Sequence, residues 1–260
     1  MLIFTRDKKR LLEHFRKDPV LFAYHIGDLD DFHFDFCQWG ATYGKSPRID
    51  DVTLLYTGLP TPTLLAFGLT DKFQELLREL IPILPPRFHC HFQERDRSIF
   101  REHFRETDLG SHQKMHLREF HPGVTGLQSD KIIRLGASDE QALKGLFEDA
   151  YPDNYFVPRM LESGKYLGYK DGGRIVAVTG VHTISEAHKV AVLGNITTHP
   201  DFRGRGLAGG LTSQLLEELT SEGYMVCLNV QRDNKPAIKC YERLGFVKVH
   251  EYVEALYEVN

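Results

Sequence analysis

Hydrophobic periodicity defines helices and strands most clearly in the second half of the chain. Four leucines recur at helical spacing along residues 207–221, which predicts an amphipathic helix closed by Gly223. Residues 224–230 form a predominantly apolar run, typical of a buried strand. The other strands that we expect here span 131–135, 166–169, 174–183, 190–198 and 246–257, with helices from Ser138, around 159–162 and over 236–244. This order predicts a mixed sheet covered by helices.

Two local signals sharpen these boundaries. Asp171-Gly172-Gly173 stands between two strand patterns and predicts a hairpin turn. Ser138, followed three residues later by Gln141, predicts a capping box at the start of a helix.

The first half of the chain has a weaker pattern. Its last section repeats the β-α-β-α-β order of the second half, from which we infer an internal duplication. Residues 121–130 contain Pro and two Gly between patterned regions, so we expect domains over 1–122 and 131–260 with a linker over 123–130. The expected elements are helices over 7–16, 20–24, 72–80 and 96–105 and strands over 52–56, 63–67, 87–92 and 113–120. The fold class is therefore α/β, with a mixed α+β sheet, mostly antiparallel and flanked by helices, in each domain.

Composition excludes several broad classes of protein. The 260 residues are 42% hydrophobic and 26% charged, as in a soluble globular protein. A formal charge of −4 argues against a general nucleic-acid binder, which needs a basic surface. The sequence contains no apolar run of about 18 residues, and its first residues lack a secretory apolar core, so we expect neither a membrane span nor a signal segment.

The cysteines and histidines suggest no cofactor site. Cys37, Cys90, Cys227 and Cys240 are far apart in sequence, which favours thiols in a reducing cytoplasm. His89-Cys90-His91 could place two ligands on one face of a strand, but no second pair completes a metal site. We therefore expect ordinary histidines and no metal.

A loop rich in glycine and arginine carries the most specific chemistry. Arg203-Gly204-Arg205-Gly206 follows a strand and the turn at His199-Pro200 and precedes the helix that begins near Leu207. Glycines permit close approach of a ligand, and the start of a helix presents amide groups that can hold a phosphate. The plain alternative is a flexible turn with solvated arginines.

Two other phosphate motifs fit less well. The full P-loop motif, Gly-x-x-x-x-Gly-Lys-Ser/Thr, does not occur, because Gly44-Lys45-Ser46 has Trp39 in place of the first glycine and the loop at 203–206 is not followed by Lys-Ser/Thr. Gly204, Gly206 and Gly209 match the spacing of a dinucleotide fingerprint, but they come late, after a hairpin-rich segment. Residues 68–73 hold the corresponding place in the first half without the loop's glycines.

Two motifs in order identify a resemblance. Residues 203–208 fit the Arg/Gln-x-x-Gly-x-Gly/Ala motif of the GNAT acetyltransferase superfamily, and residues 234–246 resemble its Asn-x-x-Ala-x-x-x-Tyr-x-x-x-Gly-Phe signature. The resemblance covers 130–255. It implies two GNAT-like domains, as in tandem GNAT proteins, of which the first is a degenerate copy without a cofactor loop.

The resemblance implies acetyl-CoA as acyl donor and a role for each matching position. The backbone that should face the pantetheine arm and thioester belongs to Ile196, Thr197 and Thr198. The residues that should wrap the pyrophosphate are Arg203, Gly204, Arg205, Gly206, Leu207 and Ala208. Asn234 matches an asparagine that commonly contacts the cofactor, and Tyr241 matches a tyrosine that often acts as general acid.

The chemistry agrees with an acid at Tyr241. Attack of an amine on a thioester expels a thiolate whose conjugate acid has a pKa of about 8.5, and a tyrosine with a pKa of about 10 can protonate it. The alternative is that Tyr241 only fills the core. The attacking amine must also lose a proton, for which His182, with Glu186 nearby in sequence, is a candidate base. The alternative is a surface histidine, with water carrying the proton.

The acceptor is an amine of unidentified type. Tyr155 and Phe156, with Tyr151 before them, follow the first helix of the second half and either line the acceptor pocket or pack in the core.

We expect a cytoplasmic N-acetyltransferase acting through a ternary complex, without nucleic-acid or membrane partners, and leave a homodimer open. The alternatives are a glycine-N-acyltransferase-like enzyme and a non-catalytic acyl-CoA-binding regulatory module.

Overall fold

The computed structural model describes residues 1–44, 48–123 and 127–259, in two compact units. The first unit comprises Met1–Lys114, Gln231–Asp233 and Val249–Asn260, and the second comprises Met115–Val230 and Asn234–Lys248. Residues 124–126 of the expected linker lie outside the described residues. The division into domains 1–122 and 131–260 stays a prediction, although by their contacts residues 249–260 group with the first unit.

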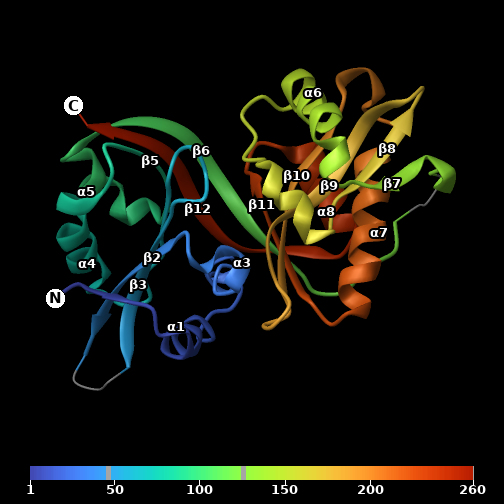
Figure 1. Ribbon diagram of the computed structural model, residues 1–260. Coiled ribbons are helices and arrows are strands. Elements are labelled where there is room, and N and C mark those ends of the chain that lie inside the picture. The colour runs from blue at the N-terminus through green and yellow to red at the C-terminus, as the bar shows by residue number, and fades with distance from the viewer. Residues whose placement is uncertain (45–47, 124–126, 260) are drawn as a thin grey trace. The chain divides into compact units, whose positions relative to one another are not determined.

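The first unit is a mixed sheet built around one parallel pair of strands (Figure 1). Its sheet order is β1-β2-β3-β4-β5-β12-β6, in which β4 and β5 are parallel and joined through α4. The strands are β1 (Ile3–Thr5), β2 (Cys37–Tyr43), β3 (Ile49–Tyr56), β4 (Thr63–Ala66), β5 (Arg87–Phe92), β6 (Phe104–Leu117) and the end of β12 (Phe246–Val259). The helices are α1 (Lys8–Phe15), α2 (Ala23–Gly27), α3 (Asp31–Phe34), α4 (Phe73–Leu80) and α5 (Arg97–Arg101).

Residues near the end of β12 complete the core of the first unit. Val253–Glu258 pairs antiparallel with Phe92–Arg87 of β5. Tyr257 is fully buried, with its ring 5.1 Å from that of Phe100 and 5.6 Å from that of Phe88. Burial of aromatic side chains contributes most of the free energy that holds such a core together.

The second unit has the same order of elements around its own parallel pair (Figure 1). Its sheet order is β11-β10-β9-β8-β7, with β10 parallel to β11 and the other pairs antiparallel. The strands are β7 (Ile132–Arg134), β8 (Leu167–Asp171), β9 (Arg174–Ser185), β10 (Val190–Thr198) and β11 (Met225–Gln231). The helices are α6 (Glu140–Ala150), α7 (Leu207–Ser221) and α8 (Lys235–Arg243), with a 3-10 segment at Pro158–Ser163.

Helices α6 and α7 pack on opposite faces of this sheet. Thr179 of β9 meets Thr212 of α7, with their hydroxyl oxygens 3.2 Å apart. The next residue, Gly180, faces the other way, because a Cβ placed there would lie 2.3 Å from the ring of Tyr166. That ring meets Phe156 edge-on, and Phe156 in turn packs against Phe147 of α6 in a tilted arrangement. The expected sheet covered by helices is confirmed.

Some local predictions hold and others are wrong. The turn at Gly172 and Gly173 forms as expected, with φ of 55° and 83°. The capping box at Ser138 and Gln141 is wrong, because Ala137–Asp139 forms a 3-10 turn before α6 begins. There the Gly136 amide donates to Asp139 Oδ2 at 3.1 Å, so Asp139 supplies the local partner instead of Ser138.

Differences in the first half have identifiable causes. The helix expected over 96–105 ends at Arg101, and the strand expected over 113–120 begins at Phe104. Phe104 packs its ring 5.1 Å from that of Phe88, so packing in the core favours a strand at this point. Strands β1 and β2 and helix α3 were not predicted.

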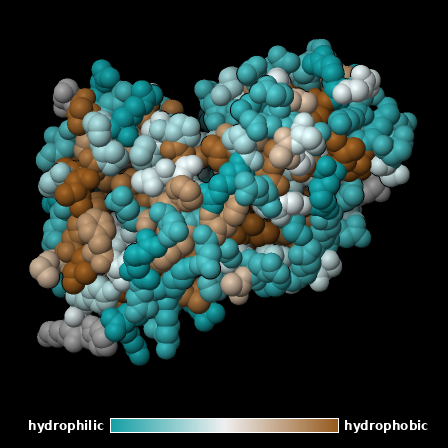
Figure 2. Space-filling model, in the orientation of Figure 1, coloured by the Kyte–Doolittle hydropathy of each residue, from teal (hydrophilic) through white to brown (hydrophobic). Residues whose placement is uncertain are grey.

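The surface matches the polar composition. Hydrophilic residues prevail on the face shown in Figure 2. Within the described residues, no helix has the length and apolar character needed to cross a membrane.

Candidate functional site

Strands β10 and β11 pair over only four residues. Their register runs from Val190↔Met225 to Leu193↔Leu228 and ends there within the described residues. On its other side β10 stays paired with β9 as far as Thr198↔Ala177. Beyond Leu193, the edge of β10 that faces β11 therefore offers backbone groups without strand partners. We call residues 194–198 and 229–230 the fork; it contains the predicted positions Ile196, Thr197 and Thr198, all half-buried.

The loop after β10 leads to an open helix start. Gly204 and Gly206 have φ of +78° and +75°, which favours glycine at both positions. Gly206 is the N-cap of α7 and offers no side chain as a cap. The amides of the first turn therefore have no partner from the helix itself, and the helix dipole adds positive potential there. Leu207 is buried and Ala208 half-buried, so both anchor this turn to the unit.

The two arginines of the loop also bind the protein itself. Arg203 donates from Nε to the carbonyl of Thr198 at 3.1 Å and from Nη2 to that of Ala150, at the end of α6, at 3.3 Å. Arg205 donates to the carbonyl of Asp201 at 3.1 Å and lies over the ring of Phe202. Arg203 thereby joins the loop to the C-terminal end of α6.

Helix α8 packs against the first turn of α7. A Cβ at Gly209 would lie 3.0 Å from Cys240 Sγ, so only a small residue allows this approach. Asn234 caps α8, with Oδ1 accepting from the Ala237 amide at 3.2 Å. Its side chain therefore already has a structural role beside the predicted cofactor contact.

Tyr241 is mostly buried next to Cys240. Burial, together with Cys240 and Tyr151, raises the pKa of its hydroxyl well above the ordinary value. The hydroxyl therefore stays protonated at neutral pH, as a general acid requires. Its ring packs on Phe246 at 6.0 Å, so the packing role is also present.

Two β-bulges interrupt the pairing of β9 with β10. The register between β9 and β10 shifts between Val192 and Leu193, which leaves His182 of β9 without an opposite residue. It shifts again between Gly194 and Thr197, where Asn195 has φ of +54°. Bulges re-aim side chains and occur often beside active sites.

The side chains from these bulges are hydrogen-bonded. His182 Nε2 lies 3.2 Å from Asn195 Oδ1. Asn195 Nδ2 donates to the hydroxyl of Tyr166 at 2.9 Å, and that hydroxyl donates to the carbonyl of Val181 at 2.9 Å. With the amide in this orientation, Asn195 Oδ1 accepts from His182, which places the proton of the neutral ring on Nε2.

The two residues predicted to line the acceptor pocket, Tyr155 and Phe156, have different surroundings. Tyr155 meets His182 edge-on, with ring centroids 6.3 Å apart, so the structure joins the two. The ring of Phe156 instead packs in a tilted arrangement against that of Phe147 of α6, with centroids 5.3 Å apart, as expected for a core residue. Glu186 lies exposed in the turn after β9.

Comparison with known proteins decides the family of this unit. The model of the acetyltransferase (GNAT) family matches residues 135–246. Residues 135–246 belong to the GNAT family. The fork, the loop and Tyr241 all lie within this GNAT region, and acetyl-CoA is the usual donor of the family.

Individual relatives extend the comparison. A mycothiol acetyltransferase of Streptomyces coelicolor is 38% identical over 106 residues, which cover 40% of this chain and 32% of that enzyme. The chain thus matches about a third or less of the length of the curated relatives, from 17% to 32%.

Solved structures show the same fold over the whole chain. A Drosophila protein is 15% identical with a TM-score of 0.72, covering 99% of this chain and 98% of its own. A tandem GNAT protein from the clavulanic acid biosynthesis pathway is 16% identical with a TM-score of 0.60, covering 98% of each chain. At these identities the likeness concerns the fold alone.

In the first unit, the loop before α4 corresponds to the loop before α7, and its amides donate to a carboxylate of the same unit. Asp51 is almost fully buried and accepts from the amides of Leu69 at 2.8 Å and Thr70 at 3.2 Å, just before α4. The hydroxyl of Thr70 also donates to Asp51. An internal anion thus occupies amides of the kind that hold a phosphate elsewhere.

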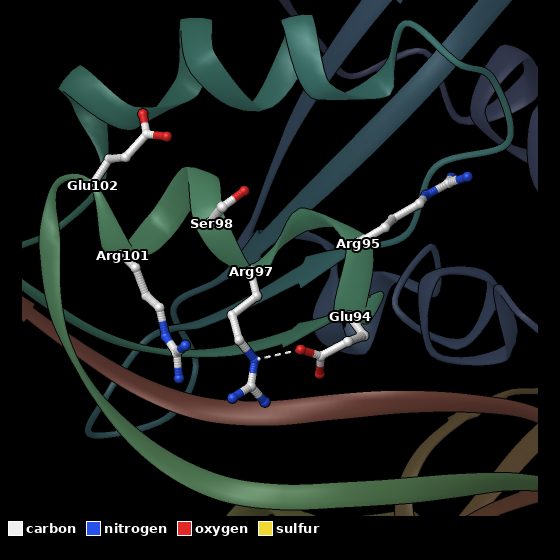
Figure 3. Close-up of a pocket in the computed structure, with 6 residues that line it drawn as sticks. All are labelled: Glu94, Arg95, Arg97, Ser98, Arg101 and Glu102. Atoms are coloured by element: carbon white, nitrogen blue, oxygen red, sulfur yellow. Dashed lines mark ion pairs between the residues drawn. The ribbon is translucent and has the colours of Figure 1, made fainter.

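A hollow of about 490 Å³ in the first unit is not an anion site (Figure 3). It is lined by Glu94, Arg95, Arg97, Ser98, Arg101 and Glu102. Arg97 pairs with Glu94, Glu106 and Asp108 at 3.0–3.1 Å, and Arg101 pairs with Glu106 at 2.7 Å. These carboxylates neutralise the arginines, and none of the sequence-predicted site residues lies here.

Sequence reasoning missed three polar residues of the site. Asn195 lies in a bulge, Asn229 at the end of a strand pair, and Tyr166 just before β8. The one signal visible in the sequence is an asparagine that interrupts the apolar run 224–230. No group of acidic, histidine or cysteine side chains suited to a metal occurs among the described residues.

Proposed function

We propose that the chain is an acetyl-CoA-dependent N-acetyltransferase that transfers the acetyl group to an amine by direct attack in a ternary complex. The fork that leads to the uncapped start of α7, inside a GNAT region, carries this proposal. The pantetheine arm of acetyl-CoA is extended and carries amide groups, so it can pair with the open edge of β10. The pyrophosphate of acetyl-CoA then lies at the first amides of α7, where the helix dipole is positive.

The chemistry needs one acid and one base. The amine nitrogen attacks the thioester carbon, a C–N bond forms, and the C–S bond breaks to release a thiolate. Tyr241 gives its proton to that thiolate. The nitrogen loses a proton to His182, directly or through water, and solvent then restores both groups.

The scattered cysteines support two further parts of the proposal. None of them has a histidine partner at a spacing typical of the family, so we expect no acyl-enzyme intermediate. The absence of Cys-x-x-Cys pairs in the sequence fits a reducing compartment, and we propose a cytoplasmic location.

Turnover tests the enzyme directly. The purified chain is mixed with acetyl-CoA and a panel of small amines, amino sugars, amino acids and peptides, and released thiol is followed. We expect release that depends on one class of amine. Tight CoA binding without turnover on any amine would favour the non-catalytic module, and preference for longer acyl groups would favour the glycine-N-acyltransferase-like alternative.

Charge reversal tests the loop. We expect Arg203→Glu with Gly206→Glu to abolish CoA binding in calorimetry, because carboxylates then occupy the place of the phosphates. Gly206→Glu alone has a matched control in Gly223→Glu. Both glycines have positive φ and open space at Cβ, but they flank opposite ends of α7, about 25 Å apart at 1.5 Å per residue. Retained CoA affinity in the double variant would refute the loop assignment.

A further inference from the structure

Asn229 stands where β11 leaves β10. The last pair between these strands is Leu193↔Leu228, so Asn229 is the first residue of β11 in the fork. Its Oδ1 is buried and has no hydrogen-bond partner among the described residues. A buried acceptor without a donor costs free energy, and such groups are rare in folded proteins.

The side chain of Asn229 shares a face of the sheet with His182. Paired residues of neighbouring strands point to the same face, and successive residues alternate. Val181, Leu193 and Leu228 form one such row on the side of α7. The next residues of the two parallel strands, Gly194 and Asn229, therefore face the other side.

The ring of His182 lies on that same side. A Cβ at Gly194 would be 2.2 Å from this ring, so the imidazole covers the Gly194 backbone. Asn229 is one residue beyond Leu228, where the last paired residues of the two strands are about 4.8 Å apart. The register therefore places the Asn229 side chain and the His182 imidazole on the same face of the sheet, where Tyr155 meets His182.

From this arrangement we propose that Asn229 binds the attacking nitrogen of the acceptor. Its Oδ1 accepts an N–H of the amine, which leaves the nitrogen lone pair to point at the thioester carbon while a second N–H faces His182. Asn229 is thus a substrate-positioning residue specific for amines. The inference rests on the proposed acetyl transfer.

Asn229→Leu tests this role, because leucine keeps the volume and removes the acceptor. We expect KM for the amine to rise about tenfold or more and kcat to fall, while the Kd of CoA stays within twofold. We also expect the thermal midpoint to hold or rise, because an unsatisfied polar group is removed. A merely structural asparagine would lower it. Gln214→Leu, which removes an amide from α7 on the opposite face, serves as control and should change neither constant.

The outcomes separate the two hypotheses. A wild-type chain that acetylates no amine overturns the proposed function and the inference together. An active wild type with an unchanged amine KM in Asn229→Leu overturns the inference alone. A raised Kd of CoA with an unchanged amine KM would assign Asn229 to the donor and also overturns it.

Discussion

Tyr241, the proposed general acid, also has a packing role. Its burial on α8 both packs its ring on Phe246 and raises the pKa of its hydroxyl. The two roles are compatible, because the packing holds the acid in its protonated form.

Tyr241→Phe removes only the acidic proton. We expect kcat to fall by about 10² to 10⁴-fold, the usual contribution of a positioned acid, with CoA affinity unchanged. Because the pKa of Tyr241 is raised, the wild-type rate should show no decline from tyrosine ionisation below about pH 10. Steady-state rates against pH and CoA calorimetry provide the measurements. Unchanged turnover in the variant would remove the acid role.

Asn195 offers a test of the hydrogen bond to His182. Asn195→Gly keeps the left-handed backbone, with φ of +54°, but removes the side chain that holds the imidazole. We expect kcat to fall roughly 5- to 10-fold, the value of one hydrogen bond, while Asn195→Asp keeps an acceptor and retains more activity. Steady-state measurement of kcat for both variants tests this prediction, and thermal unfolding checks that each variant is folded. A glycine variant as active as the wild type contradicts the positioning role.

At the scale of elements, the two helix starts that follow parallel strands are used differently. The start of α7 has no side-chain cap, whereas the loop before α4 donates to Asp51. The expected difference between residues 203–208 and 68–73 thus has a physical basis, since the start of α7 has no side-chain cap, whereas the amides before α4 donate to a carboxylate of the same unit.

Asp51→Asn weakens that internal contact. The neutral amide accepts hydrogen bonds less strongly than a carboxylate, so we expect the free energy of unfolding to fall by about 1–3 kcal/mol. CoA should still bind with one molecule per chain, because the loop before α7 is untouched. Denaturant unfolding and calorimetric stoichiometry measure the two effects. A lost or doubled CoA site would contradict this division of roles.

Sequence patterns located the elements of the second unit closely, and less closely those of the first. Residues 207–221 form a helix as predicted, because a leucine stripe and a closing glycine are local signals. Strand β2 was missed because Cys37–Tyr43 shows no alternation that distinguishes it from a loop. Tyr241 and His182 could be singled out from motif and residue type. The partners Asn195 and Asn229 could not, because strand register arises from contacts distant in sequence.

At the scale of the whole molecule, buried histidines gather in the first unit. Burial lowers the pKa of His14 and His91 from 6.5 to about 4, and that of His25 well below 6.5. For His91 burial outweighs the nearby carboxylate of Glu254, 3.5 Å away.

Stability should therefore fall in acid. The unfolded chain takes up protons on these histidines near pH 6.5, whereas the folded chain resists until about pH 4. We expect the urea midpoint to decrease as the pH falls through this window and to be insensitive to these groups above it. His25→Leu should flatten the slope, and replacement of the exposed His121 should not. An equal slope in His25→Leu would exclude His25 as a source.

The strand β12 also fixes an order of events during synthesis. Val253–Glu258 forms the partner of β5, yet the ribosome makes it only after residues 115–248. The nascent first unit must therefore wait with β5 exposed along one edge, while the residues that form most of the GNAT unit emerge. In this chain the part made first is completed last, so vectorial folding from the N-terminus cannot finish it before the translation of β12.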